Sequence, residues 1–138
     1  MNKHDIIVRE KMFANDAMSR WLGIEINFIE LGTCSLKMTV RKEMLNGFGI
    51  AHGGITYSLA DSALAFASNS HGVQCVSIET SISHTKTVKH NDVLTAIAKE
   101  LSLSNKIAVY DVIVTNQHQE TVALFKGTVY RTKKSWIE

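Results

Sequence analysis

Hydrophobic and polar residues follow two different rhythms along this chain. Between residues 76 and 88, apolar or long side chains occupy every second position, and serine, threonine or glutamate fills the positions between them. A period of two is typical of a β-strand, because successive side chains point to opposite faces. One face of this strand is apolar at its start, and the other is polar throughout. The alternating positions are Val76, Ile78, Thr80, Ile82, His84, Lys86 and Val88.

Further runs of β-branched and aromatic residues predict five more strands. These runs lie near residues 24–30, 34–41, 93–103, 106–115 and 121–131. A turn at Gly32 separates the first two runs, and turns at Ser104-Asn105 and Gln119-Glu120 divide the last three. The first two strands therefore form a hairpin, and the last three form an antiparallel meander.

Helical periodicity appears in two places. Residues 5–21 carry apolar side chains at helical spacing among charged ones, which predicts an amphipathic covering helix within the N-terminal segment 1–21, closed by Gly23. The stretch ITYSLADSALAFA, which starts at residue 55, is rich in alanine and leucine and apolar on nearly every side, which predicts a buried central helix over 55–69. Just before it, residues 46–54 contain four glycines and predict a loop.

This order of elements defines the fold class. Two strands, a long apolar helix and four more strands imply an α+β fold in which an antiparallel sheet wraps around one long central helix. A length of 138 residues, with 45% hydrophobic and 20% charged residues, fits one globular domain over 1–138. The net charge of +2 comes from residues spread along the chain, without the dense basic patch that nucleic-acid binding generally needs.

The cysteines, the N-terminus and the histidines indicate the cellular compartment and whether a metal site is expected. Cys34 and Cys75 have neither metal-site spacing nor the density of a disulfide scaffold, so we expect two buried thiols in a reducing cytoplasm. The N-terminus is too polar for a signal peptide, and no apolar run approaches the roughly 20 residues of a membrane span. No histidine pair has the spacing that zinc requires, so no metal site is expected.

Asp61 is the first candidate for chemistry. It lies in the most apolar helix of the chain, and no Lys or Arg occurs between residues 44 and 85. A buried, unpaired carboxylate costs several kcal/mol, so the site needs hydrogen bonds, water, a ligand or a proton. One interpretation is a general base or nucleophile in a cleft. The other is a structural acid on a wet stripe beside Tyr57 and Ser58, or one paired with a distant strand.

The glycine-rich loop is the second candidate. Backbone N–H groups and the positive end of a helix dipole come together at His52, Gly53 and Gly54, and a substrate carbonyl can approach a glycine closely. This pattern predicts an oxyanion hole, in which one donor is commonly worth about 3 to 4 kcal/mol. The alternative is that the glycines only make a tight entry to the helix.

One chain alone cannot combine these two candidates. Asp61 follows Gly53 by eight residues, so the two lie about 12 Å apart along one helix. If two central helices pack antiparallel across a dimer axis, the Asp61 of each approaches the Gly53 of the other. The sequence therefore predicts a homodimer with two composite sites.

Three segments of the chain resemble a known family. MFANDAMSRWLGI, MLNGFGIAHGGITYSLADSALAFASNS and VYDVIVTNQHQETVALFKG are similar to the hot-dog thioesterases of phenylacetate degradation, the PaaI type. The resemblance covers roughly residues 12–131, and its most specific part is Asn-x-x-Gly-x-x-His-Gly-Gly with an aspartate eight residues after the first paired glycine. It implies hydrolysis of phenylacetyl- or hydroxyphenylacetyl-CoA, no metal or redox cofactor, and a homotetramer of hot-dog dimers.

The resemblance also implies roles for single residues. Asp61 would attack the thioester or activate a water, while the Gly53 N–H would hold the oxyanion. Asn46 would position the water or the carbonyl, and His52 would support the loop. Ser77 matches a position that helps to organise the attacking water, although an ordinary exposed strand serine remains the alternative.

The chain departs from the family pattern at residues 82–92. Related enzymes usually carry an aromatic residue followed by Arg-Pro here, whereas this chain has His84, Lys86 and Thr87. Lys86, Lys89 and Lys106 are candidates for binding the phosphates of coenzyme A, as point charges without the fork of an arginine. For each lysine, a solvated surface charge is the alternative.

Two other functions fit the same fold. In a hydratase or dehydratase, a histidine and a carboxylate would move protons beside the thioester, and His52 with Asp61 superficially supplies such a pair. A non-catalytic acyl-CoA sensor would use the same pocket for binding only. The loop pattern favours the hydrolase over the hydratase. A sensor would need an output surface or a further domain, and the sequence predicts neither.

Overall fold

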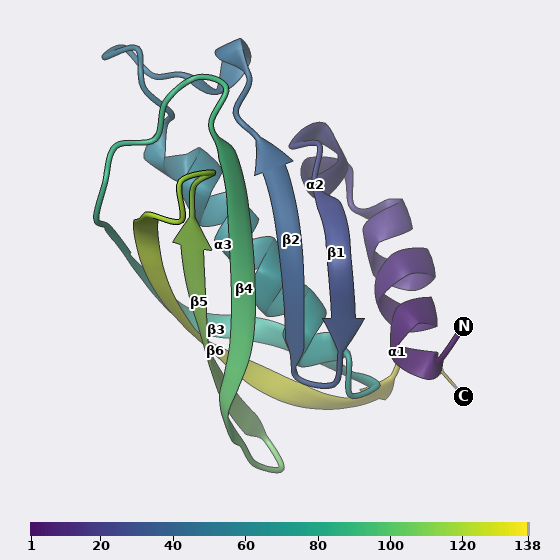
Figure 1. The fold of residues 1–138 in the computed structure, drawn as a ribbon. Coiled ribbons are helices and arrows are strands. Elements are labelled where there is room, and N and C mark those ends of the chain that lie inside the picture. Colours follow the sequence, from purple (N-terminus) through teal and green to yellow (C-terminus); the bar gives the residue numbers. More distant parts are fainter. Residues whose placement is uncertain (138) are drawn as a thin grey trace.

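The computed structural model describes residues 1–137 as an antiparallel sheet that curves around one long helix (Figure 1). The six strands follow the order β1-β2-β4-β5-β6-β3, and every neighbouring pair is antiparallel. This architecture confirms the α+β hot-dog fold expected from the sequence. The strands are β1 (Glu25–Glu30), β2 (Thr33–Thr39), β3 (Val73–His84), β4 (Val93–Leu103), β5 (Ile107–Thr115) and β6 (Thr121–Ser135).

The central helix α3 (Gly53–Asn69) fills the concave side of the sheet. Its buried side chains pack against apolar residues from every strand of the sheet core, which makes the helix the centre of a single hydrophobic cluster. The helix begins at Gly53 and not at residue 55 as predicted, because His52 caps it and both paired glycines adopt helical backbone. The predicted loop 46–54 is therefore shorter by two residues.

The N-terminal segment is not one continuous helix, so the prediction of a single covering helix is wrong. It consists of α1 (Lys3–Asp5), a π-helical stretch (Ile6–Met12), a 3-10 turn (Phe13–Asn15) and α2 (Ala17–Trp21). The break falls at Asp16, whose backbone is extended and whose side chain accepts a hydrogen bond from the Ser19 N–H at 2.9 Å. An aspartate in this position satisfies a free donor of the new helix, which favours a restart over continuation.

The strand predicted to run to residue 88 ends at His84. Residues 85–92 instead form a loop that packs on the glycine-rich segment, and the Ala51 N–H donates to the Val88 carbonyl at 2.8 Å. Val88 is buried in this contact. Its apolar character therefore reflects packing against the loop and not membership of the strand.

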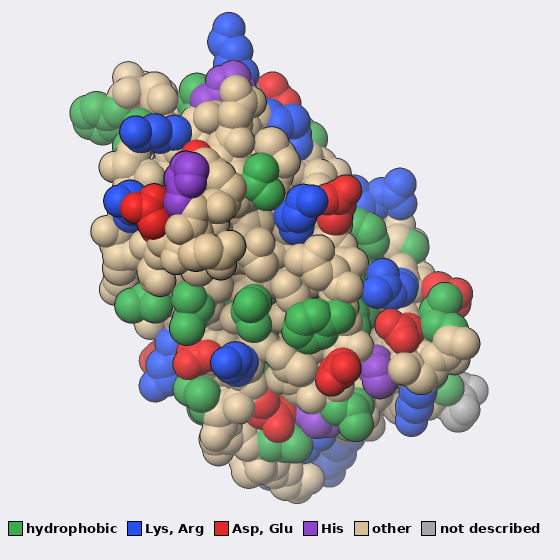
Figure 2. All heavy atoms as spheres, in the orientation of Figure 1, with side chains coloured by type: hydrophobic (Ala, Val, Ile, Leu, Met, Phe, Trp, Pro, Cys, Tyr) green, Lys and Arg blue, Asp and Glu red, His purple; other side chains and the backbone are tan. Residues whose placement is uncertain are grey.

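Two surfaces of the sheet remain apolar in the single chain. β3 is an edge strand, and it exposes Val76 and Ile78 by 56% and 58%. On the outer face, Ile97, Ile113 and Leu124 are cross-strand neighbours on β4, β5 and β6. Figure 2 shows hydrophobic side chains gathered in a row across this side of the molecule, with charged side chains around them.

Candidate active site

The start of α3 leaves one backbone donor available. His52 Nδ1 accepts a hydrogen bond from the Gly54 N–H at 2.9 Å, while the His52 N–H donates to the Met44 carbonyl at 2.9 Å. Within residues 1–137, we find no hydrogen-bond acceptor for the Gly53 N–H. The predicted oxyanion hole therefore reduces to one of the two glycines, because capping already occupies the N–H of Gly54. This N–H also lies at the positive end of the helix dipole.

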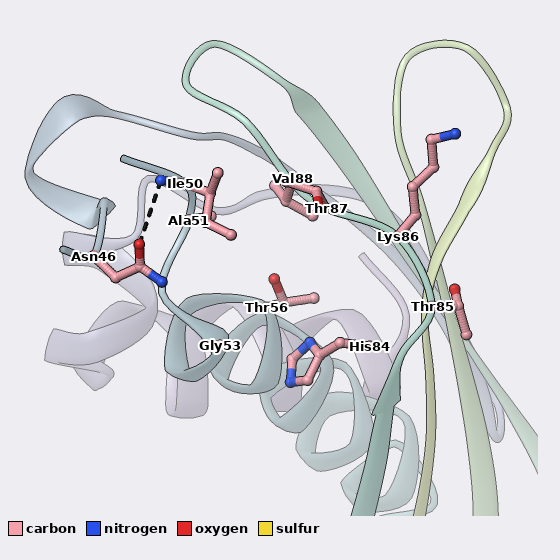
Figure 3. Close-up of a pocket in the computed structure, with 10 residues that line it drawn as sticks. All are labelled: Asn46, Ile50, Ala51, Gly53, Thr56, His84, Thr85, Lys86, Thr87 and Val88. Carbon is pink, nitrogen blue, oxygen red and sulfur yellow. Dashed lines mark hydrogen bonds between the residues drawn. The ribbon is translucent and has the colours of Figure 1, made fainter. Parts of the chain in front are cut away.

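Asn46 holds the glycine-rich loop in shape. Its side-chain oxygen accepts hydrogen bonds from the N–H groups of Phe48 at 2.9 Å and Ile50 at 3.4 Å, and its own N–H donates to the Ile50 carbonyl at 2.7 Å. The oxygen is therefore engaged, and the amide NH₂ remains as a donor. In Figure 3 this nitrogen lies on the Gly53 side of the Asn46 amide.

A cavity of about 380 Å³ opens beside these two residues. It is enclosed by the loop, the first turn of α3, and the chain that leaves β3 (Figure 3). Most of the side chains in its walls are polar. Such walls suit a ligand with carbonyl and amide groups better than a purely apolar ligand. The lining residues are Asn46, Ile50, Ala51, Gly53, Thr56, His84, Thr85, Lys86, Thr87 and Val88.

Seven of these ten lining residues were not among the site residues predicted from the sequence, and Thr56 and His84 are two of them. Thr56 looks like an ordinary member of the apolar helix, and it is in fact buried. His84 differs from the aromatic residue that the family usually carries, and this difference is the signal that the sequence offered.

Asp61 lies on a half-buried stripe of α3. The stripe contains Tyr57, Ser58, Asp61, Ser62 and Ala65, at the i, i+3 and i+4 spacing of one helix face. Burial raises the pKa of Asp61 above its usual range, and the nearby negative charge of Asp16 raises it further. Within residues 1–137 the carboxylate has neither an ion-pair partner nor a hydrogen-bond donor. The wet stripe considered from the sequence is thus real, and the acid on it is unpaired.

Asp61 and Ser77 share a second, smaller cavity of about 60 Å³, which Cys75 also lines. Ser77 is therefore close to the acid, as the resemblance implied, but neither residue lines the cavity beside Gly53. Cys75 is only half-buried, whereas Cys34 is fully buried. One chain thus carries two separate half-sites: an acid with a serine, and a free amide with Asn46.

The three lysines do not come together in one chain. Lys86 forms an ion pair with Glu120 at 2.8 Å, and in Figure 3 its side chain points away from Gly53 toward the turn between β5 and β6. Lys89 is exposed in the loop after β3, and Lys106 lies in the turn between β4 and β5, at the bottom of Figure 1. That turn is at the opposite end of the sheet from the cavity.

The described residues form neither a metal-binding cluster nor a membrane-spanning helix. No group of three or more His, Cys, Asp or Glu residues within 1–137 is arranged to hold a metal ion. In the same part of the chain, no helix has both the length and the apolar character that crossing a membrane requires.

An antiparallel sheet wrapped around one long helix is the hot-dog fold. The family model of the thioesterase superfamily matches residues 48–123, which include Gly53, Asp61 and Ser77. The chain belongs to the thioesterase superfamily and is a thioester hydrolase.

Individual relatives support the resemblance stated from the sequence. The chain is 41% identical to the acyl-coenzyme A thioesterase PaaI of Escherichia coli, over 87% of this chain and 86% of that one. The crystal structure of the E. coli PaaI protein superposes with a TM-score of 0.90, at 38% identity and 92% coverage of both chains. A thioesterase protein of Streptococcus pneumoniae with coenzyme A has a TM-score of 0.85 at 30% identity, over 91% of this chain and 98% of that one.

Proposed function

We propose that this enzyme hydrolyses aryl-acetyl-CoA thioesters, of the phenylacetyl and hydroxyphenylacetyl type, to the free acid and coenzyme A. We also propose that it does so at composite sites of a homodimer, assembled further into a homotetramer. The separation of the two half-sites on one chain carries this proposal, because neither half alone can both bind an oxyanion and deliver a nucleophile.

The chemistry follows from the two half-sites. The thioester carbonyl approaches the Gly53 N–H, and Asn46 donates to the carbonyl or to the water. Asp61 of the second subunit takes a proton from a water whose oxygen bonds to the carbonyl carbon. The tetrahedral intermediate expels the coenzyme A thiolate, which receives that proton. In the covalent route, the carboxylate itself bonds to the carbon and the C–S bond breaks to release the thiolate. A water then hydrolyses the anhydride to the free acid and restores Asp61, and the proton left on Asp61 passes to the thiolate. Both routes need the ionised Asp61 and the same geometry.

The edge strand supports the dimer. β3 presents unpaired backbone groups and the exposed side chains of Val76 and Ile78, and soluble chains rarely leave such an edge uncovered. Antiparallel pairing of β3 with its copy across a two-fold axis would satisfy these groups. Ser77 belongs to this strand and the Asp61 stripe adjoins it, so the second subunit would cover them at the same time.

The substrate class rests on the likeness to E. coli PaaI, whose gene lies in the phenylacetic acid degradation operon. Coenzyme A as the carrier is supported by the relative that contains it. We propose that Lys86, which lines the cavity, exchanges its ion pair with Glu120 for a phosphate, and that Lys89 in the neighbouring loop contributes a second charge. Lys106 lies at the opposite end of the sheet, so it would have to reach the phosphates from another subunit. A relative from Archaeoglobus fulgidus, 42% identical over 94% of this chain, is named as an esterase without a substrate. The aryl-acetyl preference is therefore the part of the proposal that most needs measurement.

One observation weighs against the hydratase alternative. His52 Nδ1 accepts the Gly54 N–H and so has no free lone pair to act as a base. The remaining nitrogen then carries the proton in the neutral ring. A hydratase would need another base within reach of the acyl chain. No feature of the described residues favours the acyl-CoA sensor.

The test is thiol release from aryl-acetyl, benzoyl, short-chain and long-chain acyl-CoAs. We expect aryl-acetyl-CoA to turn over fastest, and Asp61→Asn to lose at least 100-fold in kcat. Glu25→Gln, which removes an exposed carboxylate from β1, is the matched control and should behave as the wild type. Turnover of other acyl groups only would refute the substrate class, and no turnover of any member would refute the hydrolase.

Composite sites have their own test. Gly53→Val and Asp61→Asn are each expected to be inactive, but a mixed dimer contains one site with both native residues. Co-refolding the two variants in equal amounts should therefore restore about a quarter of wild-type activity, because half of the dimers are mixed and each has one working site. Absence of any restoration in confirmed mixed dimers would show that each site belongs to one chain.

A further inference from the structure

His84 is the last residue of β3, and its imidazole lies directly against Gly53. A Cβ atom built on Gly53 would be 3.3 Å from His84 Nε2 and 3.5 Å from Cε1. In Figure 3 the ring projects from the end of the strand toward the first turn of α3. The contact joins residues 31 positions apart in the sequence, at the one amide that the capping of α3 leaves free.

The ring nitrogens of His84 are available to a ligand. Within residues 1–137, neither nitrogen forms a hydrogen bond or an ion pair. None of the nine residues that line the cavity with His84 is an Asp or Glu that would compete for its N–H. The proposed mechanism so far uses this side chain for nothing.

The distances allow one oxygen to contact both groups. In standard geometry, a Cβ lies about 2.5 Å from the N of its own residue. His84 Nε2 is therefore at most about 5.8 Å from the Gly53 N. Two donors that share one acceptor, at about 2.9 Å each, are separated by no more than this distance. One carbonyl oxygen can therefore accept from the Gly53 N–H and from His84 at the same time.

We propose that His84 is a second hydrogen-bond donor to the thioester carbonyl oxygen, so that its imidazole N–H and the Gly53 N–H together form the oxyanion hole. This inference rests on the proposed thioesterase function and deepens it. It makes His84 a catalytic residue, because the ring touches the reacting carbonyl. The role requires the Nε2–H form of the ring. A donor aimed at the oxygen where negative charge develops acts mainly on kcat.

Replacing the ring by one of similar shape without a donor is the direct test. His84→Phe should lower kcat for the best acyl-CoA substrate by roughly 100-fold and change KM little. His84→Gln keeps an N–H donor on a side chain of different shape and should recover part of the loss. His90→Phe makes the same substitution at an exposed histidine outside the cavity and should leave kcat unchanged. Wild-type kcat in His84→Phe would overturn the proposal.

A binding measurement distinguishes a donor from a space filler. One ligand is a ketone analogue of the acyl-CoA, with a methylene between sulfur and carbonyl, and the other is the thioether without the carbonyl. His84→Phe should weaken the ketone analogue at least tenfold relative to the thioether. Equal weakening of both would show a packing role and overturn the proposal. Because neither ligand turns over, this result stands even if the wild type hydrolyses no acyl-CoA, which would refute the proposed function instead.

Discussion

Gly127→Ala is a sharp test of how tightly the sheet packs on the central helix. Gly127 lies in β6, opposite Tyr110 of β5, and its backbone φ is not positive. A Cβ at this position would be 2.5 Å from Leu64 Cδ2, 3.1 Å from Leu64 Cδ1 and 3.2 Å from Phe125 Cε1. Leu64 is only 1% exposed, so its methyl groups have little free space beyond the small cavity of about 60 Å³ that it lines with Asp61 and Ser77. The extra methyl must therefore push Leu64 into a poorer rotamer or displace the helix.

The magnitude follows from two opposing effects. Overpacking a tight core costs about 1–3 kcal/mol, whereas replacing a glycine restricts the unfolded chain and returns about 0.4–1 kcal/mol. We expect a net loss of about 1–2 kcal/mol, which corresponds to a Tm lower by roughly 4–8 °C for a chain of this size. Urea unfolding followed by circular dichroism, at one fixed protein concentration, would measure it.

Two controls make the test specific. Gly47→Ala adds the same methyl where no atom lies within 4 Å, and it should change the free energy of unfolding by less than about 0.5 kcal/mol. In a Leu64→Val background, the cost of Gly127→Ala should fall by more than about 0.5 kcal/mol, because the clashing methyl has moved away. A Gly127→Ala variant as stable as the wild type, or costs that add in the double variant, would show that Leu64 does not pack on Gly127.

Three further predictions concern the titrating groups. Asp16→Asn removes the charge that helps to raise the pKa of Asp61 and keeps an acceptor for the Ser19 N–H. The acid limb of the kcat/KM profile should therefore move to lower pH. No shift, or a shift to higher pH, would contradict this. Because the pKa of Asp61 is raised in the folded state, its ionisation lowers stability as the pH rises through the window between the unfolded and folded values. Asp61→Asn should therefore match or exceed the wild type in urea unfolding at pH 7 and lose that advantage in acid, and a less stable variant at pH 7 would refute it. Burial alone raises the pKa of Glu100, but hydrogen bonds from Tyr110 and His71 lower it overall, so its stabilisation is present at neutral pH and lost as the pH falls through the folded value. Tyr110→Phe should cost about 1–2 kcal/mol at pH 7 and less in acid, and a cost independent of pH would contradict the assignment.

Elements set by local pattern were predictable from the sequence. The strand expected at 93–103 has those bounds in the structure, because β-branched and other apolar residues recur through it and its ends coincide with polar turns. The central helix was predictable for the same reason, since alanine and leucine run through it without a break. Its true start at Gly53 was not, because glycine disfavours helix and the cap that compensates comes from the His52 side chain.

The N-terminal break shows where pattern reasoning fails. The apolar residues before and after Asp16 keep a helical spacing, so periodicity alone indicates one helix. The hydrogen bonds of Ser19 divide the expected helix. Its N–H and its hydroxyl donate to the Asp16 carboxylate at 2.9 and 2.6 Å. The Ser19 hydroxyl also forms a hydrogen bond with the Ser62 hydroxyl at 2.7 Å. The Ser62 contact is tertiary, with a partner 43 residues away. An aspartate followed three residues later by a serine was the only local signal of the cap.

The candidate site was also predictable only where local geometry determines it. The eight-residue offset between Gly53 and Asp61 was enough to show that one helix cannot unite them, because helix geometry is independent of tertiary context. The neighbour of Gly53 was not predictable, because His84 reaches it only through the register of β3 against β6 and the curvature of the sheet. Sequence reasoning thus found Gly53 and Asp61, whose relation is fixed by their spacing along the chain. It missed His84, which the sheet brings to the start of the helix.

The half-buried stripe on α3 connects stability with assembly. A helix wrapped on all sides would bury Asp61 without a partner, at a cost of several kcal/mol, so the fold leaves that stripe half-buried and the acid in contact with solvent. The same opening leaves β3 as a bare edge with two exposed apolar side chains, which is unfavourable for an isolated chain. A second copy on this side would cover the edge and bring a helix start, with a free N–H and an unpaired histidine, toward the acid. The half-buried stripe with Asp61 and the exposed edge of β3 are unfavourable in the single chain. They are also the features that a composite site requires.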